Sequence, residues 1–168
     1  YNYEIKFQSM SKNELFELDS IDLQLLDALQ TDAAQSNQAL AEQLQISPPT
    51  CLRRTKRLHR AGLIERQVAI LQPDRIAALL GHGLQAIVEI TLERQGAELL
   101  DAFEARAVQD SAVQQCWRVS PGPDFVLITH TPDMPAYLAL AQRLFTSHAN
   151  VRNVRAFFST KRAKFDTR

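Results

Sequence analysis

The sequence has no long apolar run, and this absence excludes a membrane-spanning helix. No window of the 168 residues approaches the roughly 18 consecutive apolar residues that a helix needs to cross a bilayer. No basic segment followed by an apolar one opens the chain, so we expect no signal peptide, no membrane partner and a cytoplasmic protein. Residues 1–9 look like an appended protease-cleavage linker, which makes Met10 the expected native start.

Cysteine is scarce, and its placement argues against metal and disulfide chemistry. Cys51 and Cys116 lie far apart, without His or Cys at metal-ligand spacing. We interpret both as free thiols in a reducing compartment, and a long-range disulfide is the less favoured alternative. Glycine-rich phosphate loops, nucleophile–base motifs and paired carboxylates are missing as well. We therefore predict no catalytic residue, no metal and no cofactor other than an effector.

Net charge is also missing, because 19 basic residues balance 19 acidic ones. The two signs are nevertheless separated along the chain. Residues 10–46 contain seven acids and one base, whereas residues 47–66 contain six bases and one acid. A polyanion at short range meets the local charge rather than the total, so nucleic acid is a candidate partner.

Three helices are predicted where this charge contrast lies. Apolar residues recur every three or four positions in residues 19–31, and Asp19 can cap that helix. Ser36 is the expected cap of a second helix and Ser47 that of a third, which Gly62 ends. A leading helix followed by two helices with a tight break is a helix-turn-helix layout. The residues after Gly62 alternate enough to predict a short strand or wing.

The third helix is the most informative segment for function. In SPPTCLRRTKRLHRAGLI, we expect Cys51, Leu52, Thr55 and Leu58 to face the interior and the basic residues to cover the other faces. Such a basic face is often only solvated. Here, however, it lies on the second helix of a helix-break-helix pair, and in a helix-turn-helix this second helix enters the major groove of DNA. Cations there neutralise phosphates, and arginine pairs with guanine. We therefore predict binding to double-stranded DNA through Ser36, Ser47, Pro49, Thr50, Arg53, Arg54, Lys56 and Arg57.

The second half of the sequence has the rhythm of an α+β domain. The order of predicted elements is β-α-β-β-α-β, which is the ferredoxin-like split βαβ unit. Strands are expected over 84–92, 112–120, 124–131 and 151–160, and helices over 96–109 and 133–148. Pro73, Gly81 and Gly83 cluster between the halves and indicate a hinge. The expected domains are a winged helix-turn-helix at residues 10–70, a linker at 71–83 and the βαββαβ domain at 84–165.

Both halves resemble the Lrp/AsnC family of bacterial and archaeal transcription regulators. The likeness rests on the pattern LD-x-ID-x-x-LL-x-x-LQ, then SP-x-x-C-x-x-R-x-x-RL and GLI, and on CWRVSPGPDFVLIT and TPDMPAYLAL further on. It covers about residues 18–165. The resemblance implies homodimers paired through the sheets of the second domain, often assembled as octamers (tetramers of dimers) around which DNA wraps. It also implies amino-acid sensing, by a small effector held between dimers near the loop that joins the second and third strands.

That loop lies in the segment VSPGPDFVLI, which departs from the family pattern V-[ST]-G-x-[YF]-D. Pro121 stands in place of the glycine, and a proline cannot take a positive φ and has no N–H to donate. Gly122 could replace that glycine by a shift of one residue; the effector could instead differ, or the site could be vestigial. Asp124 could bind an ammonium group or could equally be a turn residue that accepts local N–H groups. The resemblance implies an effector site made of Arg118, Ser120, Pro121, Gly122, Asp124, Met134, Phe157, Phe158 and Ser159.

Two other functions remain as alternatives. Decarboxylases of tetrapyrroles such as siroheme look like this two-domain fold, although the basic third helix fits DNA better. A weakly specific protein that compacts DNA would use the same basic surface. The leading prediction is a sequence-specific transcription regulator modulated by a small effector, and not an enzyme.

Overall fold

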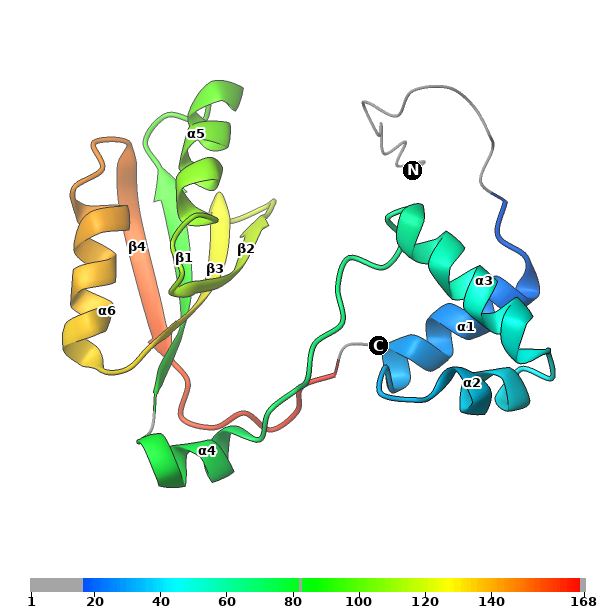
Figure 1. The fold of residues 1–168 in the computed structure, drawn as a ribbon. Helices are drawn as coiled ribbons and strands as arrows, with labels where there is room; N and C mark the ends of the chain where they lie inside the picture. Colours follow the sequence, from blue (N-terminus) through cyan, green and yellow to red (C-terminus); the bar gives the residue numbers. More distant parts are fainter. Residues whose placement is uncertain (1–16, 82, 167–168) are drawn as a thin grey trace. The chain divides into compact units, whose positions relative to one another are not determined.

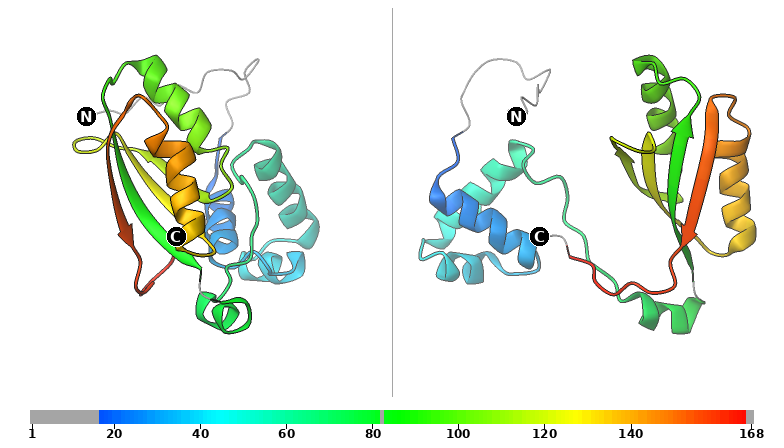
Figure 2. Two further views of the ribbon diagram at one scale, coloured as in Figure 1. Left: turned by 90° about the vertical axis from the view of Figure 1, so that its left-hand side faces the viewer. Right: turned by 180° about the vertical axis from the view of Figure 1, so that it is seen from behind.

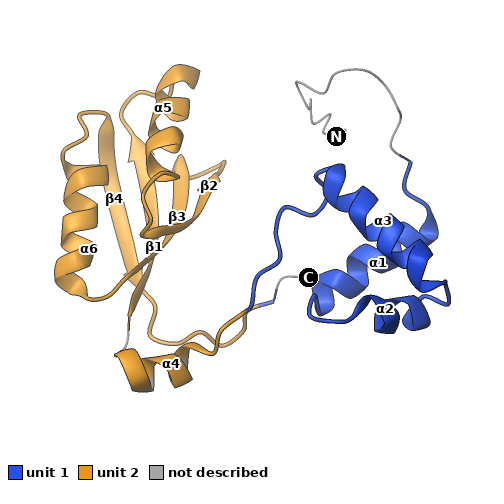
Figure 3. Cartoon of the chain, in the orientation of Figure 1, with its two compact units in different colours: residues 1–69, 166–168 blue, residues 70–165 orange. Residues whose placement is uncertain are grey.

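The computed structural model of the chain describes residues 17–81 and 83–166 (Figure 1). The linker expected at residues 1–9 lies outside this part. The chain divides into two compact units, residues 1–69 with 166–168 and residues 70–165 (Figure 3). None of the helices in the described residues is long and apolar enough to cross a membrane.

The first unit contains three helices around one small core. They are α1 (Ser20–Thr31), α2 (Asn37–Gln43) and α3 (Pro48–Arg60). The helices begin where the sequence supplies caps. Asp19 and Asp22 form a reciprocal capping box at the start of α1, and the Ser36 hydroxyl accepts the backbone N–H of Ala39 at 3.1 Å. The core consists of Leu25, Ala28, Leu40, Ala41, Leu44, Cys51 and Leu58.

The segment after α3 differs from the prediction of a wing. Gly62, at φ +71°, follows the end of the helix as expected, but residues 63–72 contain no strand. A strand needs a neighbour that pairs with its backbone N–H and C=O groups, and no described residue of this unit supplies one. The wing prediction is therefore wrong. Within the expected linker, Pro73–Leu80 forms a short helix, α4, which the sequence analysis missed.

The second unit has the predicted βαββαβ order. Its four antiparallel strands lie in the order β2-β3-β1-β4, which is the ferredoxin-like arrangement. Both α5 and α6 cover the same face of the sheet (Figure 2). The elements are β1 (Leu84–Leu92), α5 (Ala97–Ala107), β2 (Val113–Arg118), β3 (Phe125–Thr131), α6 (Met134–Ala141), a π-helical turn (Gln142–Thr146) and β4 (Val151–Phe158).

The two faces of this sheet differ in what covers them. On the helix side, alternate residues of β1 from Ala86 to Leu92 are buried against Phe103 and Phe145. The other face is covered by no described helix of this unit, and Ile87, Trp117 and Phe157 are each about half exposed there. On α5, Phe103 and Ala107 are buried against the sheet, whereas Val108 at the end of the helix is exposed.

Candidate functional site

The helix α3 has three distinct faces, and the first packs on the core. Cys51 and Leu58 are fully buried, and Thr55 between them donates its hydroxyl to the Cys51 carbonyl at 3.0 Å. Leu52 was expected on this face, but it is 44 % exposed. The buried edge follows the spacing 51, 55, 58, and a residue one position after Cys51 points about 100° away on a helix.

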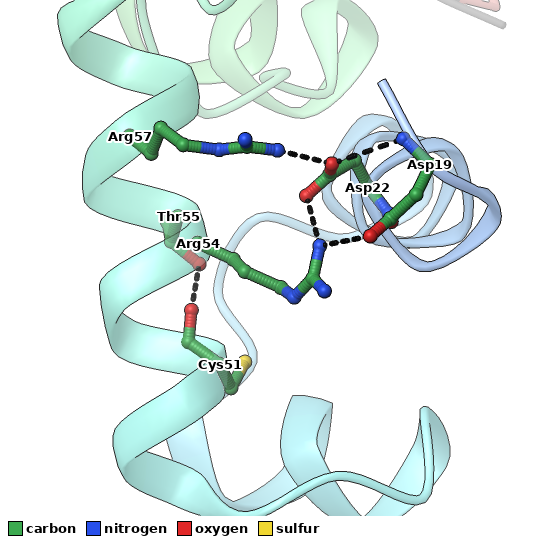
Figure 4. A network of polar contacts seen from close by, with 6 residues as sticks. All are labelled: Asp19, Asp22, Cys51, Arg54, Thr55 and Arg57. Atoms are coloured by element: carbon green, nitrogen blue, oxygen red, sulfur yellow. Dashed lines mark hydrogen bonds and ion pairs between the residues drawn. The ribbon is translucent and has the colours of Figure 1, made fainter. Parts of the chain in front are cut away.

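The second face of α3 points at α1 and carries two arginines (Figure 4). Nη1 of Arg54 lies 2.8 Å from Oδ1 of Asp22 and 2.8 Å from Oδ2 of Asp19. The guanidinium of Arg57 donates to the other oxygen of the Asp22 carboxylate. Asp22 is completely buried, and the Arg54 side chain is 19 % exposed. Two of the three arginines predicted to contact DNA, Arg54 and Arg57, therefore pair with acids of their own domain.

These contacts shift the pKa values of Asp19 and Arg54. The pKa of Asp19 is lowered, first by the hydrogen bond from the backbone N–H of Asp22 and then by the Arg54 guanidinium. The pKa of Arg54 is raised, first by its hydrogen bond to Asp22 and then by that to Asp19. Both shifts favour the charged forms of Asp19 and Arg54, which is what their ion pair requires.

The third face of α3 is open and cationic. Pro49, Arg53, Lys56 and Arg60 are spaced by four, three and four residues, so they form one stripe along the helix, and all four are exposed. Ser47 lies at the start of this stripe, where its hydroxyl pairs with that of Thr50 at 2.8 Å instead of capping the helix. The stripe includes Arg60, which was not among the predicted DNA contacts.

The first turns of α2 and α3 lie beside each other. The Asn37 side chain donates to the Pro48 carbonyl at 2.9 Å, which ties the start of one helix to the start of the other. Ser36, the cap of α2, is exposed next to this contact. The structure thus groups Ser36, Ser47, Pro49, Thr50, Arg53 and Lys56 near the N-terminal and open sides of α2 and α3, and it turns Arg54 and Arg57 toward α1.

In the predicted effector loop, Asp124 makes two hydrogen bonds to the backbone of β1. Its Oδ2 accepts the backbone N–H of Leu92 at 2.6 Å, beside the irregularity in pairing between Thr91 and Leu92. Its own N–H donates to the Ile90 carbonyl at 2.8 Å. Gly122, at φ +125°, takes the left-handed conformation that the neighbouring Pro121 cannot adopt. The positive φ in this loop is thus found at Gly122, one residue after Pro121.

Arg118, predicted to contact the effector, is paired within its own unit. Its Nη2 lies 2.7 Å from Oδ1 of Asp101 and 2.7 Å from Oε2 of Glu104, both on α5. The pKa of Arg118 is raised, chiefly by the hydrogen bond to Asp101. An anionic ligand at this guanidinium would compete with two carboxylates.

The remaining predicted effector residues lie at the other end of the sheet. β3 begins at Phe125 beside the loop and ends at Thr131, and Met134 follows at the start of α6. At about 3.3 Å per residue, the two ends of β3 are roughly 20 Å apart. Phe158 pairs with Ala86 near this second end and packs edge-on against Tyr137, with ring centroids 4.9 Å apart. One chain therefore presents two groups of predicted effector residues, Arg118 to Asp124 and Met134 with Phe157 to Ser159.

A helix-turn-helix unit with an open cationic face, followed by a ferredoxin-like unit, defines a two-domain DNA-binding regulator. Residues 18–59 match the AsnC-type helix-turn-helix domain, and residues 85–168 match the Lrp/AsnC ligand binding domain. The chain belongs to the Lrp/AsnC family, and it is a transcription regulator of that type, as the sequence predicted.

Curated relatives and solved structures of this family are similar to the chain over nearly its whole length. The leucine-responsive regulatory protein of Salmonella typhimurium is 34% identical over 152 residues, which are 90% of each chain. An uncharacterized HTH-type transcriptional regulator of Haemophilus influenzae is 30% identical over 89% of this chain and 87% of its own. A transcriptional regulator of Neisseria meningitidis in complex with L-Met superposes with a TM-score of 0.76 at 29% identity, covering 90% of this chain and 95% of its own. An AsnC family regulator of Agrobacterium tumefaciens gives the same TM-score and coverage at 26% identity.

The partners of Arg54 and Arg57 were not predicted from the sequence. Asp19 and Asp22 are three residues apart on α1, and the two arginines are three apart on α3. This equal spacing of two acids and two bases, on helices that share one small core, could have predicted the pairing from the sequence. The charge contrast between residues 10–46 and 47–66 therefore includes an internal pairing.

Proposed function

We propose that this regulator binds double-stranded DNA through the open face of α3 and responds to a small effector with the chemistry of an amino acid. The observation that carries the DNA part is the stripe of Pro49, Arg53, Lys56 and Arg60. It lies on the helix that a helix-turn-helix places in the major groove, and it points away from the core.

The stripe supplies two kinds of contact. Arg53 lies in the first half of α3, where side chains of such helices reach base edges, and Lys56 follows it one turn later. Either side chain can donate to guanine O6 and N7. Arg60 lies in the last turn and suits a phosphate. At the other end, the hydroxyls of Ser36, Ser47 and Thr50 can donate to phosphate oxygens, as side chains at helix starts commonly do.

For assembly, the open face of the second sheet fits a second copy of the same chain. A soluble protein rarely leaves an apolar sheet face uncovered, and Ile87, Trp117 and Phe157 are exposed on this one. A dimer formed there brings two α3 helices to the two half-sites of a palindromic operator. An octamer built as a tetramer of dimers is the further assembly that we propose, and it would let DNA wrap around the particle.

For the effector, the two groups of residues on one chain support a site shared between chains. Asp124 and the loop N–H groups suit the ammonium and carboxylate of an amino acid, and Met134 with Phe157 offers an apolar wall. The groups lie at opposite ends of the sheet, so a small ligand contacts both only where two chains meet. The L-Met complex of the Neisseria meningitidis relative supports an amino acid as the ligand class.

A paired substitution tests the DNA surface. Arg53→Ala with Lys56→Ala should lower the affinity for operator DNA by at least tenfold, because two cations leave the groove. Each lost phosphate contact should also reduce the slope of log K against log salt by about 0.9. The matched control, Arg94→Ala with Arg152→Ala, removes the same charge from exposed positions of the other unit. Equal affinities and slopes for the two double variants would show that DNA binds elsewhere.

A further inference from the structure

We propose that the buried Asp22 carboxylate positions the recognition helix, and that Arg54 and Arg57 serve this purpose instead of contacting DNA. This inference rests on the proposed DNA-binding face of α3. It assigns a role to four residues of the first unit, Asp19, Asp22, Arg54 and Arg57, which we call the α1–α3 clamp.

The clamp connects the backbone of α1 rigidly to α3. Asp22 and Asp19 are held in the first turn of α1 by their capping box, with Asp22 N–H to Asp19 Oδ1 at 2.9 Å and Asp19 N–H to Asp22 Oδ2 at 3.2 Å. The carboxylates therefore have little freedom to move. Each oxygen of Asp22 then receives one arginine of α3, Oδ1 from Arg54 and Oδ2 from Arg57.

The two arginines fix the rotation of α3 about its own axis, which hydrophobic packing alone does not determine. Contacts such as those of Leu25 and Leu58 are non-directional, so a short helix can rotate or slide on them at small cost. Arg54 and Arg57 are one turn apart, and their charged hydrogen bonds to one carboxylate have strict geometry. Two such points on one helix set its rotation about its own axis, and this rotation decides where Arg53 and Lys56 point.

The charges of the clamp also argue against a DNA contact. Two guanidinium groups face two carboxylates, so the cluster offers no net positive charge to a phosphate. For Arg54 to reach DNA, Oδ1 of the buried Asp22 carboxylate would lose the hydrogen bond that Arg54 donates, which is unfavourable at a fully buried charge. Arg53, next to Arg54 in sequence, has no such constraint and is exposed.

Adjacent lysine substitutions separate the two roles. Arg54→Lys keeps the charge, but its side chain is one bond shorter than the path to Nη1, the nitrogen that contacts both Asp19 and Asp22, so its ammonium does not reach the same position. We expect it to weaken operator binding about tenfold with the salt slope unchanged, at a temperature where circular dichroism shows the protein fully folded. Arg53→Lys, the matched control, keeps a cation in the groove and should change affinity less. Equal or reversed effects of the two lysines would overturn the proposal.

Removing the acid gives a second, independent test. Asp22→Asn takes a negative charge away from the DNA-binding domain, so a purely electrostatic view predicts tighter binding. If the clamp positions α3, Asp22→Asn should instead weaken operator binding about tenfold. Adding Arg54→Gln to Asp22→Asn should then lower the affinity for the operator no further. Asp19→Asn, at a half-exposed position with Arg54 as its clamp partner, is the milder variant for use where Asp22→Asn does not fold.

The outcomes keep the clamp and the DNA surface distinct. Loss of binding in the Arg53 and Lys56 double variant, with Asp22→Asn binding as well as or better than wild type, would refute the clamp and leave the DNA surface standing. Wild-type affinity in that double variant would refute the DNA surface itself, whatever the clamp variants do.

Discussion

Replacing Asp124 by alanine should destabilise the second unit by about 1.5–3 kcal/mol, the usual cost of losing a hydrogen bond to a charged group. The acceptor lost is Oδ2, which lies 2.6 Å from the backbone nitrogen of Leu92. Leu92 is 1 % exposed, so solvent can reach this N–H only poorly. The last residue of β1 that pairs with β3 is Ile90, opposite Phe125, so no residue of β3 lies opposite Leu92 to accept this N–H.

Asparagine at the same position separates the structural role of Asp124 from a role in ligand binding. Its amide oxygen still accepts the Leu92 N–H, so Asp124→Asn should cost less than about 1 kcal/mol. It carries no negative charge, however, and should lose the attraction for an ammonium group. We expect the asparagine variant to fold normally and to lose any thermal stabilisation by amino acids.

Urea unfolding followed by tryptophan fluorescence measures both variants. Trp117 is the single tryptophan of the chain and reports on the second unit. With a slope of about 2 kcal/mol per molar urea, the alanine variant should unfold at a urea concentration lower by roughly 1 M. An alanine variant as stable as wild type would refute the structural role. An asparagine variant that keeps a wild-type amino-acid response would refute the ligand role.

Two further predictions concern acid stability and assembly. Arg143 holds the pKa of Asp110 below its usual value of 3.8, so this pair stabilises the fold above about pH 4 and the contribution is lost as pH falls through the lowered pKa. Arg143→Gln should raise the Asp110 pKa in an NMR titration of the carboxyl carbon and make stability less sensitive to acid; an unchanged pKa would contradict the pairing. If the open sheet face is the dimer contact, dilution should shift Trp117 emission to the red as that ring meets water, and Trp117→Ala should weaken the dimer in sedimentation; concentration-independent emission would place the contact elsewhere.

The regular elements of the fold could be predicted because their causes are local. β1 has the predicted bounds, 84–92, since its apolar and β-branched residues leave no alternative period. The helix expected over 133–148 was found with its Asp133 cap, but it changes to a π-helical turn after Ala141, which packing decides and spacing does not show. The prediction of a wing was wrong for a similar reason, since a strand forms only where another segment pairs with it, and that segment can be far away in the sequence.

The predicted site residues also differ in how far the sequence alone could place them. The open stripe of α3 follows from helical spacing alone, so Arg53 and Lys56 could be placed from the sequence. The orientation of Arg54 could not, because it depends on Asp22, 32 residues earlier. For Asp124 the sequence favoured equally a turn residue that accepts local N–H groups and a residue that binds an effector. Only the position of the Leu92 N–H shows that it has a structural role.

The separation of the two groups of predicted effector residues along one sheet has a consequence for sensing. If the proposed shared site is right, a ligand that touches both groups binds a pair of chains, so its apparent affinity rises with the chain concentration, by mass action, in the range where the chains are not yet assembled. In that range the amount of regulator would set the ligand level at which it responds. Such a protein would measure its own abundance and its effector in a single binding event.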